Sequence, residues 1–223
     1  MPPRPEVVAF DVVETLFALD PVRDRMKEAG LGAEVMPLWF AGFLRDAFAL
    51  DLAGTFAPFK EVAQATLRVV MANGGIDPSD AKIARVLDAF AELPAHPDVR
   101  PAFDRLREAN VRIVTVTNGS AENTKKLLDR AGLAAHVEKT ISIDEVKRWK
   151  PAAEVYLHMA KSVGVDPSKV ALVAAHAWDV HGAKRAGLRT GWVVRKDKIV
   201  SPAIALPDAQ GNTLTEVVER LIG

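Results

Sequence analysis

Two patterns of apolar positions alternate along this chain: short continuous runs, and longer stretches with helical spacing. The continuous runs are rich in Val, Ile and Ala, which is typical of strands buried on both faces of a parallel sheet. They lie at 7–10, 111–116, 170–176 and 190–194, with a shorter, outer run at 139–143. Helical spacing predicts helices over 98–109, 121–130, 153–163, 177–186 and 213–222. Strands that alternate with helices indicate an α/β fold with a doubly wound parallel sheet.

A long block without any strand pattern follows the first run. Helical spacing there predicts helices over 20–29, 34–50, 59–71 and 79–90. We therefore expect two domains: an α/β core formed by 1–17 and 96–223, and a helical cap formed by 18–95. An insert that leaves a sheet at the carboxyl end of a strand starts from the edge where such folds bind ligands, so it is suited to act as a lid.

Composition narrows the function classes. The chain has 223 residues, with 29 basic and 29 acidic side chains and no cysteine. The balanced charge argues against nucleic acid or an anionic membrane as the partner. The lack of cysteine excludes disulfides and a cysteine nucleophile. The opening residues show no secretory-signal pattern, and no apolar run is long enough to span a bilayer, so we expect a cytoplasmic protein.

Polar and charged side chains follow the predicted central strands, at the point where each strand ends. They are Asp11 and Thr15 after the first run, Thr117 and Asn118 after the second, and His176 and Asp179 after the third, with Lys150 on a loop before Pro151. The carboxyl ends of parallel strands meet at one edge of the sheet. We therefore expect these residues to converge on one site.

These residue types suit covalent catalysis by a carboxylate. Asp11 would be the nucleophile, and Lys150 would keep it ionised and offset developing negative charge. Thr117, Asn118 and nearby backbone N–H groups would bind an anionic group of the substrate. Asp179 would fix Lys150 in place.

The order of these residues resembles the four motifs of the haloacid dehalogenase superfamily, whose members are aspartate-nucleophile hydrolases. The motifs match as Asp11 to Thr15, Thr117-Asn118, Lys150 and Asp179, and the resemblance spans the whole chain, including the helical insert. Finer features resemble the type II (S)-2-haloacid dehalogenases. These features are VTNGS at 116–120, Val155-Tyr156, the segment from His176 to Asp179, and Leu38-Trp39.

The resemblance implies hydrolysis of a short 2-haloalkanoic acid to the 2-hydroxy acid through an ester on Asp11. The substrate would be a small carboxylic acid, the product a halide, the assembly a homodimer, and no cofactor would be needed. The implied catalytic residues are Asp11, Thr15, Lys150 and Asp179, and the implied substrate-binding residues are Thr117, Asn118, Trp39, Phe40, Tyr156 and His176. His176 stands where that branch usually carries Asn, and a purely structural place in the core remains an equal alternative for it.

The position two residues after Asp11 separates two activities of the superfamily. Phosphatases usually carry a second Asp there, which protonates the leaving alkoxide, whereas this chain has Val13. General acid catalysis is worth roughly 10²- to 10⁴-fold, and a halide leaves without a proton. We expect dehalogenation without a metal, because Ala175 and His176 stand where further carboxylates would be needed. A Mg²⁺-dependent phosphatase and a non-catalytic protein of the same fold remain the alternatives.

The sequence departs from the type II pattern in its predicted cap. Type II enzymes carry an Arg just after the lid Trp, where it cradles the departing halide, but Phe40 and Ala41 follow Trp39 here. Arg45, four residues after Ala41, could reach the same face of the lid. The alternative is a halide pocket formed by Trp39, Phe40 and Asn118. Elsewhere, Trp192 is expected to be structural, and the mixed-charge run 195–198 is expected to be a solvated loop.

Overall fold

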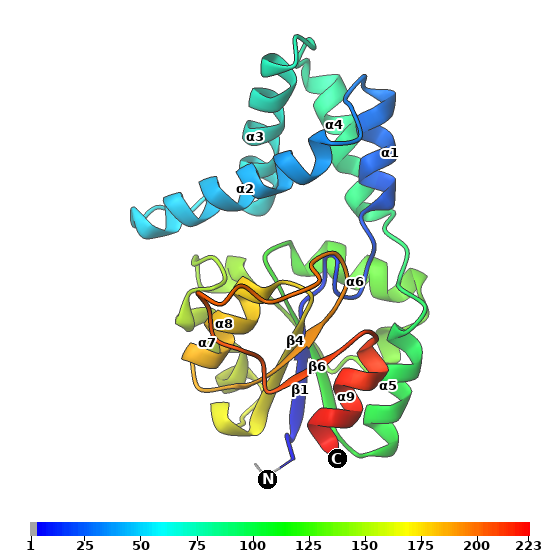
Figure 1. The fold of residues 1–223 in the computed structure, drawn as a ribbon, viewed down its shortest axis with the longest axis vertical. Coiled ribbons are helices and arrows are strands. Elements are labelled where there is room, and N and C mark those ends of the chain that lie inside the picture. Colours follow the sequence, from blue (N-terminus) through cyan, green and yellow to red (C-terminus); the bar gives the residue numbers. More distant parts are fainter. Residues whose placement is uncertain (1–3) are drawn as a thin grey trace. The chain divides into compact units, whose positions relative to one another are not determined.

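The computed structural model describes residues 4–223, and in this range the core is a parallel sheet with helices on both faces (Figure 1). The strands lie in the order β3-β2-β1-β4-β5-β6, and every neighbouring pair is parallel. Their bounds are Val7–Phe10 (β1), Arg112–Thr117 (β2), Lys139–Ser142 (β3), Val170–Ala174 (β4), Arg189–Val193 (β5) and Ala209–Gly211 (β6). The predicted α/β fold with a parallel sheet is confirmed.

The helices of the core alternate with its strands. They are α5 (Val99–Glu108), α6 (Ala121–Arg130), α7 (Ala153–Ser162), α8 (Ala177–Arg185) and α9 (Leu214–Ile222), with 3₁₀ turns at Ala134–His136, Ile143–Glu145 and Pro167–Lys169. Helices α5 and α9 lie on one face of the sheet, and α7 and α8 lie on the other (Figure 1). The start of α6 shows a side-chain cap, because the hydroxyl of Ser120 accepts a hydrogen bond from the backbone N–H of Asn123 at 3.2 Å.

Strand β1 occupies the centre of the sheet, between β2 and β4. All of its residues are buried, and its last residue, Phe10, is in register with Thr115 of β2 and Val173 of β4. Burial on both faces explains why this run is apolar throughout. The next residue, Asp11, is therefore carried to the edge of the sheet between the carboxyl ends of two neighbouring strands.

Contacts between Cα atoms divide the chain into two compact units, Met1–Phe17 with Ala95–Gly223, and Ala18–Pro94. The second unit contains α1 (Asp20–Glu28), α2 (Val35–Leu52), α3 (Phe59–Asn73), α4 (Asp80–Asp88) and a 3₁₀ turn at Ala89–Ala91. Over residues 4–223, no helix combines the length and apolar character needed to cross a bilayer.

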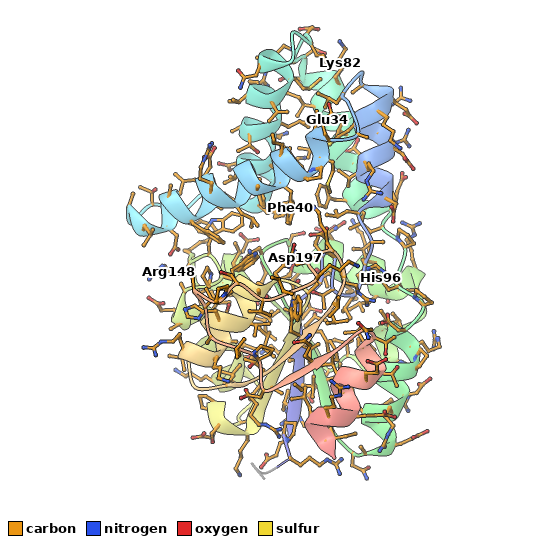
Figure 2. All side chains as sticks on the ribbon, viewed as in Figure 1. Glu34, Phe40, Lys82, His96, Arg148 and Asp197 are labelled. Carbon is orange, nitrogen blue, oxygen red and sulfur yellow. The ribbon has the colours of Figure 1, made fainter. Side chains whose placement is uncertain are left out.

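The interior of the second unit is aromatic. The ring of Phe43 lies 5.9 Å from that of Trp39 and 4.8 Å from that of Phe59, which in turn lies 5.2 Å from Phe90. Pairs of this kind contribute about 0.5–1.5 kcal/mol each beyond their area burial. Phe40, labelled in Figure 2, extends from α2 and joins the same cluster, with its ring 6.4 Å from Trp39.

The structure differs from the sequence-based predictions in three details. The pattern does not indicate β6, because Ala-Gln-Gly is neither an apolar run nor β-branched, and pairing with β5 holds it in place. The pair Asp20-Pro21 is typical of an N-cap followed by the first helical residue, but Asp20 is itself the first residue of α1, and the N-cap is Leu19. Arg195 is not part of a solvated loop, since its guanidinium forms an ion pair with Asp98 at 2.8 Å and donates to the carbonyl of Thr15 at 3.1 Å.

Candidate active site

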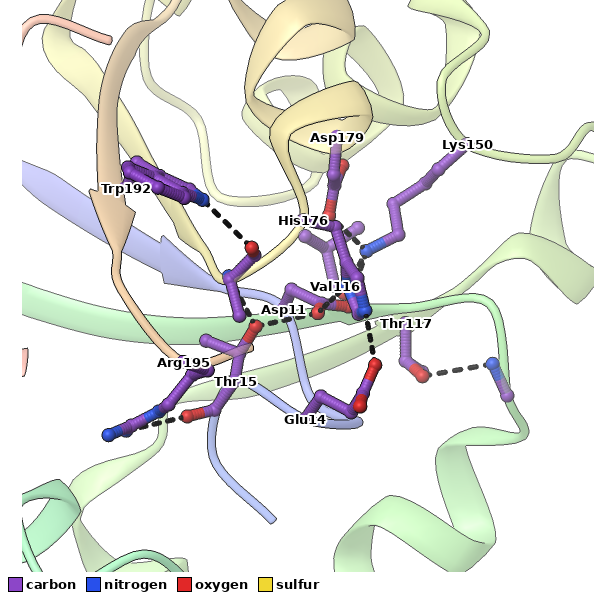
Figure 3. Close-up of polar contacts among 12 residues, drawn as sticks. Asp11, Glu14, Thr15, Val116, Thr117, Lys150, His176, Asp179, Trp192 and Arg195 are labelled. Atoms are coloured by element: carbon purple, nitrogen blue, oxygen red, sulfur yellow. Dashed lines mark hydrogen bonds and ion pairs between the residues drawn. The ribbon is translucent and has the colours of Figure 1, made fainter. Parts of the chain in front are cut away.

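Asp11 lies at the centre of a polar network at the carboxyl end of β1 (Figure 3). The hydroxyl of Thr15 donates to its Oδ2 at 2.7 Å, and the ammonium of Lys150 donates to its Oδ1 at 2.7 Å. The Nδ1 atom of His176 lies 3.1 Å from Oδ2. Asp11 is only 5% exposed, so these protein groups surround its carboxylate in place of bulk water.

Lys150 comes from the loop before α7 and is held on every side. Its Nζ donates to Asp11, to Oδ2 of Asp179 at 2.6 Å and to the carbonyl of Val116 at 3.1 Å. These acceptors satisfy the three N–H bonds of an ammonium ion. The backbone N–H of Lys150 donates to Oδ1 of Asn118 at 3.1 Å, which fixes the loop. The result is a fully buried cation between two carboxylates.

Asp179 lies in the first turn of α8 and is also fully buried. Its Oδ1 accepts a hydrogen bond from the hydroxyl of Tyr156 at 2.6 Å. Gly182 permits this close approach, because a Cβ there would lie 2.4 Å from Cβ of Pro151 and 2.9 Å from the Tyr156 hydroxyl. Burial and the charge of Asp179 raise the pKa of Tyr156 well above its ordinary value, so the hydroxyl remains a hydrogen-bond donor.

A second ion pair, which the sequence pattern does not indicate, forms the other side of Asp11. The Nε2 atom of His176 lies 2.9 Å from Oε2 of Glu14. Glu14 has a φ of 61°, in the left-handed region that few non-glycine residues adopt. In this turn its side chain points toward His176 (Figure 3), a direction that the spacing between Asp11 and Glu14 leaves undecided. The ring of His176 stacks on that of Trp178, with 5.2 Å between centroids.

The charges of the network follow from these contacts. Burial raises the pKa of Asp11, but the charge of Lys150 and the hydrogen bond from His176 outweigh burial and hold this pKa well below its usual range. Burial lowers the pKa of His176, but the hydrogen bonds to Asp11 and Glu14 outweigh burial and raise it to about 10. The pKa of Lys150 is raised as well, against burial, by Asp11 and Asp179. Burial and the charge of Asp11 raise the pKa of Asp179, although Lys150 and Tyr156 oppose them. At neutral pH the network therefore combines the carboxylate of Asp11 with an ammonium and an imidazolium ion.

The turn after Asp11 is tied to the end of β4. The Oγ1 atom of Thr15 accepts a hydrogen bond from the backbone N–H of Ala175 at 2.8 Å while it donates to Asp11. The carbonyl of Ala175 accepts a hydrogen bond from Nε1 of Trp192 at 2.8 Å. The position of the Asp11 carboxylate is thus fixed from two neighbouring strands, and Trp192 has the structural place expected of it.

The sequence profile of the haloacid dehalogenase-like hydrolases matches residues 5–187. The chain belongs to this family. The (S)-2-haloacid dehalogenase 1 of Pseudomonas sp. (strain CBS-3) is 30% identical over 218 residues, which cover 96% of this chain and 95% of that protein. The (S)-2-haloacid dehalogenase of Pseudomonas sp. (strain YL) is 28% identical and covers 95% and 92% of the two chains. The solved structure of the L-2-haloacid dehalogenase from Xanthobacter autotrophicus is similar in fold, with a TM-score of 0.88 at 24% identity over 98% of both chains.

In this haloacid dehalogenase-like hydrolase, the predicted site residues fall into two groups. One hydrogen-bonded network unites Asp11, Thr15, Lys150, Asp179, Tyr156 and His176. Thr117 and Asn118 lie next to it and shape the surrounding loops: Oγ1 of Thr117 accepts a hydrogen bond from the backbone N–H of Gly119 at 2.9 Å, and Asn118 holds Lys150. Trp39 and Phe40 belong to the second unit. The substrate-binding roles of these residues stay predictions.

The two carboxylates of the network that could bind a metal ion, Asp11 and Asp179, already accept hydrogen bonds from the protein. Both oxygens of Asp11 and of Asp179 accept hydrogen bonds from neighbouring side chains. Within residues 4–223, no group of three or more His, Asp or Glu side chains is arranged to hold a metal ion. The residues of the network therefore do not fit a Mg²⁺ site, which requires several oxygen ligands around one ion. Activity without a metal stays a prediction that a chelator tests.

Proposed function

We propose that this protein hydrolyses a short 2-haloalkanoic acid to the corresponding 2-hydroxy acid through a covalent ester on Asp11. The observation that carries the proposal is a buried, hydrogen-bonded Asp11 carboxylate with Val13, and no acid, two residues further on. An alkoxide leaving group needs a proton, and a halide does not. The near-full-length similarity to proteins named (S)-2-haloacid dehalogenase supports the same substrate class.

In the first step, a carboxylate oxygen of Asp11 attacks C2 of the substrate. The new C–O bond displaces the halide, which leaves with the electron pair of the carbon–halogen bond, and C2 is inverted. Lys150 stays charged because Asp179 remains its partner after Asp11 becomes a neutral ester. Thr117, Asn118 and nearby backbone N–H groups hold the substrate carboxylate.

In the second step, water attacks the ester carbonyl carbon, Cγ of Asp11. The tetrahedral intermediate collapses, the 2-hydroxy acid departs, and Asp11 regains its carboxylate. Thr15 and Lys150 hold the side chain in one orientation through both steps. The halide-binding role predicted for Trp39 and Phe40 is part of the same proposal.

Halide release from the purified protein tests this reaction. The substrates are chloroacetate, fluoroacetate and both enantiomers of 2-chloropropionate, each with and without EDTA. We expect equal amounts of halide and 2-hydroxy acid, no effect of EDTA, and a loss of at least about 10⁴-fold in Asp11→Asn, which lacks the nucleophile.

A phosphate ester distinguishes the alternative activity. Cleavage of p-nitrophenyl phosphate that needs Mg²⁺, together with no halide from any 2-haloacid, would overturn the proposal in favour of a phosphatase.

The cytoplasmic location and the homodimeric assembly are further proposals. Light scattering of the purified protein tests the assembly.

A further inference from the structure

Both ring nitrogens of His176 face carboxylate oxygens. Nδ1 lies 3.1 Å from Oδ2 of Asp11, and Nε2 lies 2.9 Å from Oε2 of Glu14. A neutral imidazole has one N–H group, so only the imidazolium ion satisfies both acceptors. In the resting site, a proton is therefore stored on His176, directly beside the carboxylate that is proposed to form the covalent bond.

The His176–Glu14 pair lies on the more accessible side of Asp11. The side chains of Lys150 and Asp179 have no exposed surface, whereas His176 is 13% and Glu14 is 19% exposed. The water that hydrolyses an ester enters from solvent, and the proton that the reaction produces returns there. The side of Asp11 formed by His176 and Glu14 is the one suited to this exchange.

We propose that His176 is the general base for hydrolysis of the Asp11 ester, and that Glu14 is the positioning residue that holds its ring. The inference rests on the proposed function, since it concerns the second step of that reaction. Nδ1 lies 3.1 Å from Oδ2 of Asp11, so a water that approaches Cγ from the side of this ring would come within hydrogen-bond reach of the same nitrogen. A base held by a carboxylate on its far nitrogen is a recurring way to activate an oxygen.

The protons balance over the cycle. Attack on C2 turns the Asp11 carboxylate into a neutral ester and releases the halide. Without the negative charge of Asp11, the pKa of His176 falls, so Nδ1 gives its proton to solvent. The Nε2–H group of His176 stays hydrogen-bonded to Glu14. Water then adds to Cγ and passes one proton to Nδ1, and its second hydrogen ends on the hydroxyl of the product. One water is consumed, and one halide and one proton are released.

The charged groups around the ring fit this role. Asp11, at the end of β1, and Glu14, in the following turn, raise the pKa of His176. Lys150 and Asp179 are paired with each other beyond Asp11. Lys196 interacts with Glu14 from the loop after β5 and lowers the pKa of its carboxyl, though less than His176 does, while burial opposes both. Glu14 is therefore ionised beside His176 in the resting site.

Two other assignments fit less well. Asp179 is also a potential base, but its oxygens already accept hydrogen bonds from Lys150 and Tyr156 at 2.6 Å each. His176 is also a potential halide ligand, but the halide departs from the face of C2 opposite the attacking oxygen. A ring that contacts Asp11 itself lies on the wrong side of the reacting carbon for that task.

The variant His176→Gln separates the two chemical steps. Gln forms hydrogen bonds but does not accept a proton, so we expect one equivalent of chloride per protein from chloroacetate and then turnover slowed by about 10²-fold or more. Intact-mass spectrometry should show the ester accumulating on this variant and absent from Asp11→Asn. His158→Gln is the matched control, because His158 pairs with Glu145 at 2.9 Å outside the network, and it should turn over as the wild type does.

The outcomes distinguish the two proposals. Wild-type turnover by His176→Gln without accumulated ester would overturn the role of His176 and leave the proposed function standing. No halide release by the wild type would overturn the proposed function itself.

Glu14→Gln supplies a second readout that does not depend on a large loss of activity. It keeps a hydrogen-bond acceptor and removes the charge, so His176 in the ester loses its proton more easily. The pH midpoint of ester hydrolysis should move down by about one unit or more, since a close opposite charge shifts a pKa by that amount. A lower rate with an unchanged midpoint would mean that Glu14 only supports the fold, and would contradict its assignment.

Discussion

The two sides of Asp11 hold the same carboxylate but meet solvent differently. On one side, Lys150 and Asp179 have no exposed surface, and the Tyr156 hydroxyl completes their hydrogen bonds. On the other side, His176 and Glu14 keep 13% and 19% of their side-chain surface exposed. Buried charges exchange protons with solvent less readily than charges that contact water. The comparison indicates a holding function for the first side and, as proposed, a proton-transfer function for the second.

The side of Asp11 formed by Lys150, Asp179 and Tyr156 is its dry side. The largest expected effect comes from removing the cation of that side, Lys150. Lys150→Met leaves Asp11 and Asp179 as neighbouring buried carboxylates, so the free energy of unfolding should fall by about 3–5 kcal/mol, as for other broken buried pairs. Denaturant unfolding at neutral pH measures this change. Lys161→Met, on an exposed position of α7, is the control and should change stability little. Equal stability of the two variants would show that the dry side does not hold the site together.

A smaller effect is expected from the hydroxyl that completes the dry side. Tyr156→Phe removes the 2.6 Å hydrogen bond to Asp179, and hydrogen bonds to charged groups contribute about 1.5–3 kcal/mol. Ser162→Ala, which removes a hydroxyl bonded to the carbonyl of Met159 on the same helix, should cost about 1 kcal/mol or less. Thermal or denaturant unfolding compares the two variants. If Tyr156→Phe lowers the free energy of unfolding no more than Ser162→Ala does, the hydrogen bond from Tyr156 does not hold Asp179 in place.

The pH dependence of the free energy of unfolding tests the accessible side, which is formed by His176 and Glu14. The pKa of His176 rises from 6.5 to about 10 in the folded chain, so its contribution to stability is complete below the lower value and is lost as the pH rises toward the higher one. Across this window, the wild type should lose its stability advantage over His176→Gln by at most about 1.4 kcal/mol per pH unit. Denaturant unfolding at several pH values checks the slope. An advantage that does not vary with pH would show that His176 is not held as an imidazolium ion.

The sequence predicts much of this arrangement because strand ends in a parallel sheet converge. Apolar runs that end in polar residues place Asp11, Thr15 and Asp179 at one edge of the sheet, and the motif order adds Lys150 from a loop. In the structure these four side chains form one hydrogen-bonded network. The motif resemblance also names Tyr156, as a substrate-binding residue. That role stays a prediction, and the structure adds a hydrogen bond from its hydroxyl to Asp179 that the resemblance did not indicate.

Glu14, the second residue of the accessible side, escapes a sequence analysis for a physical reason. The direction of the Glu14 side chain depends on a left-handed backbone conformation, with φ of 61°, that no glycine marks. Arg195 escapes it too, because its partner Asp98 lies far away in the chain and its neighbours are ordinary solvated charges. Pairs that depend on one turn or on distant segments leave no local pattern of apolar and polar positions.

Oxygen-18 tests directly whether Asp11 forms a bond to the substrate carbon and whether water then attacks Asp11. In a single turnover of excess protein with 2-chloropropionate in H₂¹⁸O, we expect the heavy oxygen in the Asp11 carboxylate, while the 2-hydroxy acid carries the oxygen that Asp11 held before. Peptide mass spectrometry of residues around Asp11 and mass analysis of the product measure both. Heavy oxygen in the product of the first turnover, with none in Asp11, would contradict the account.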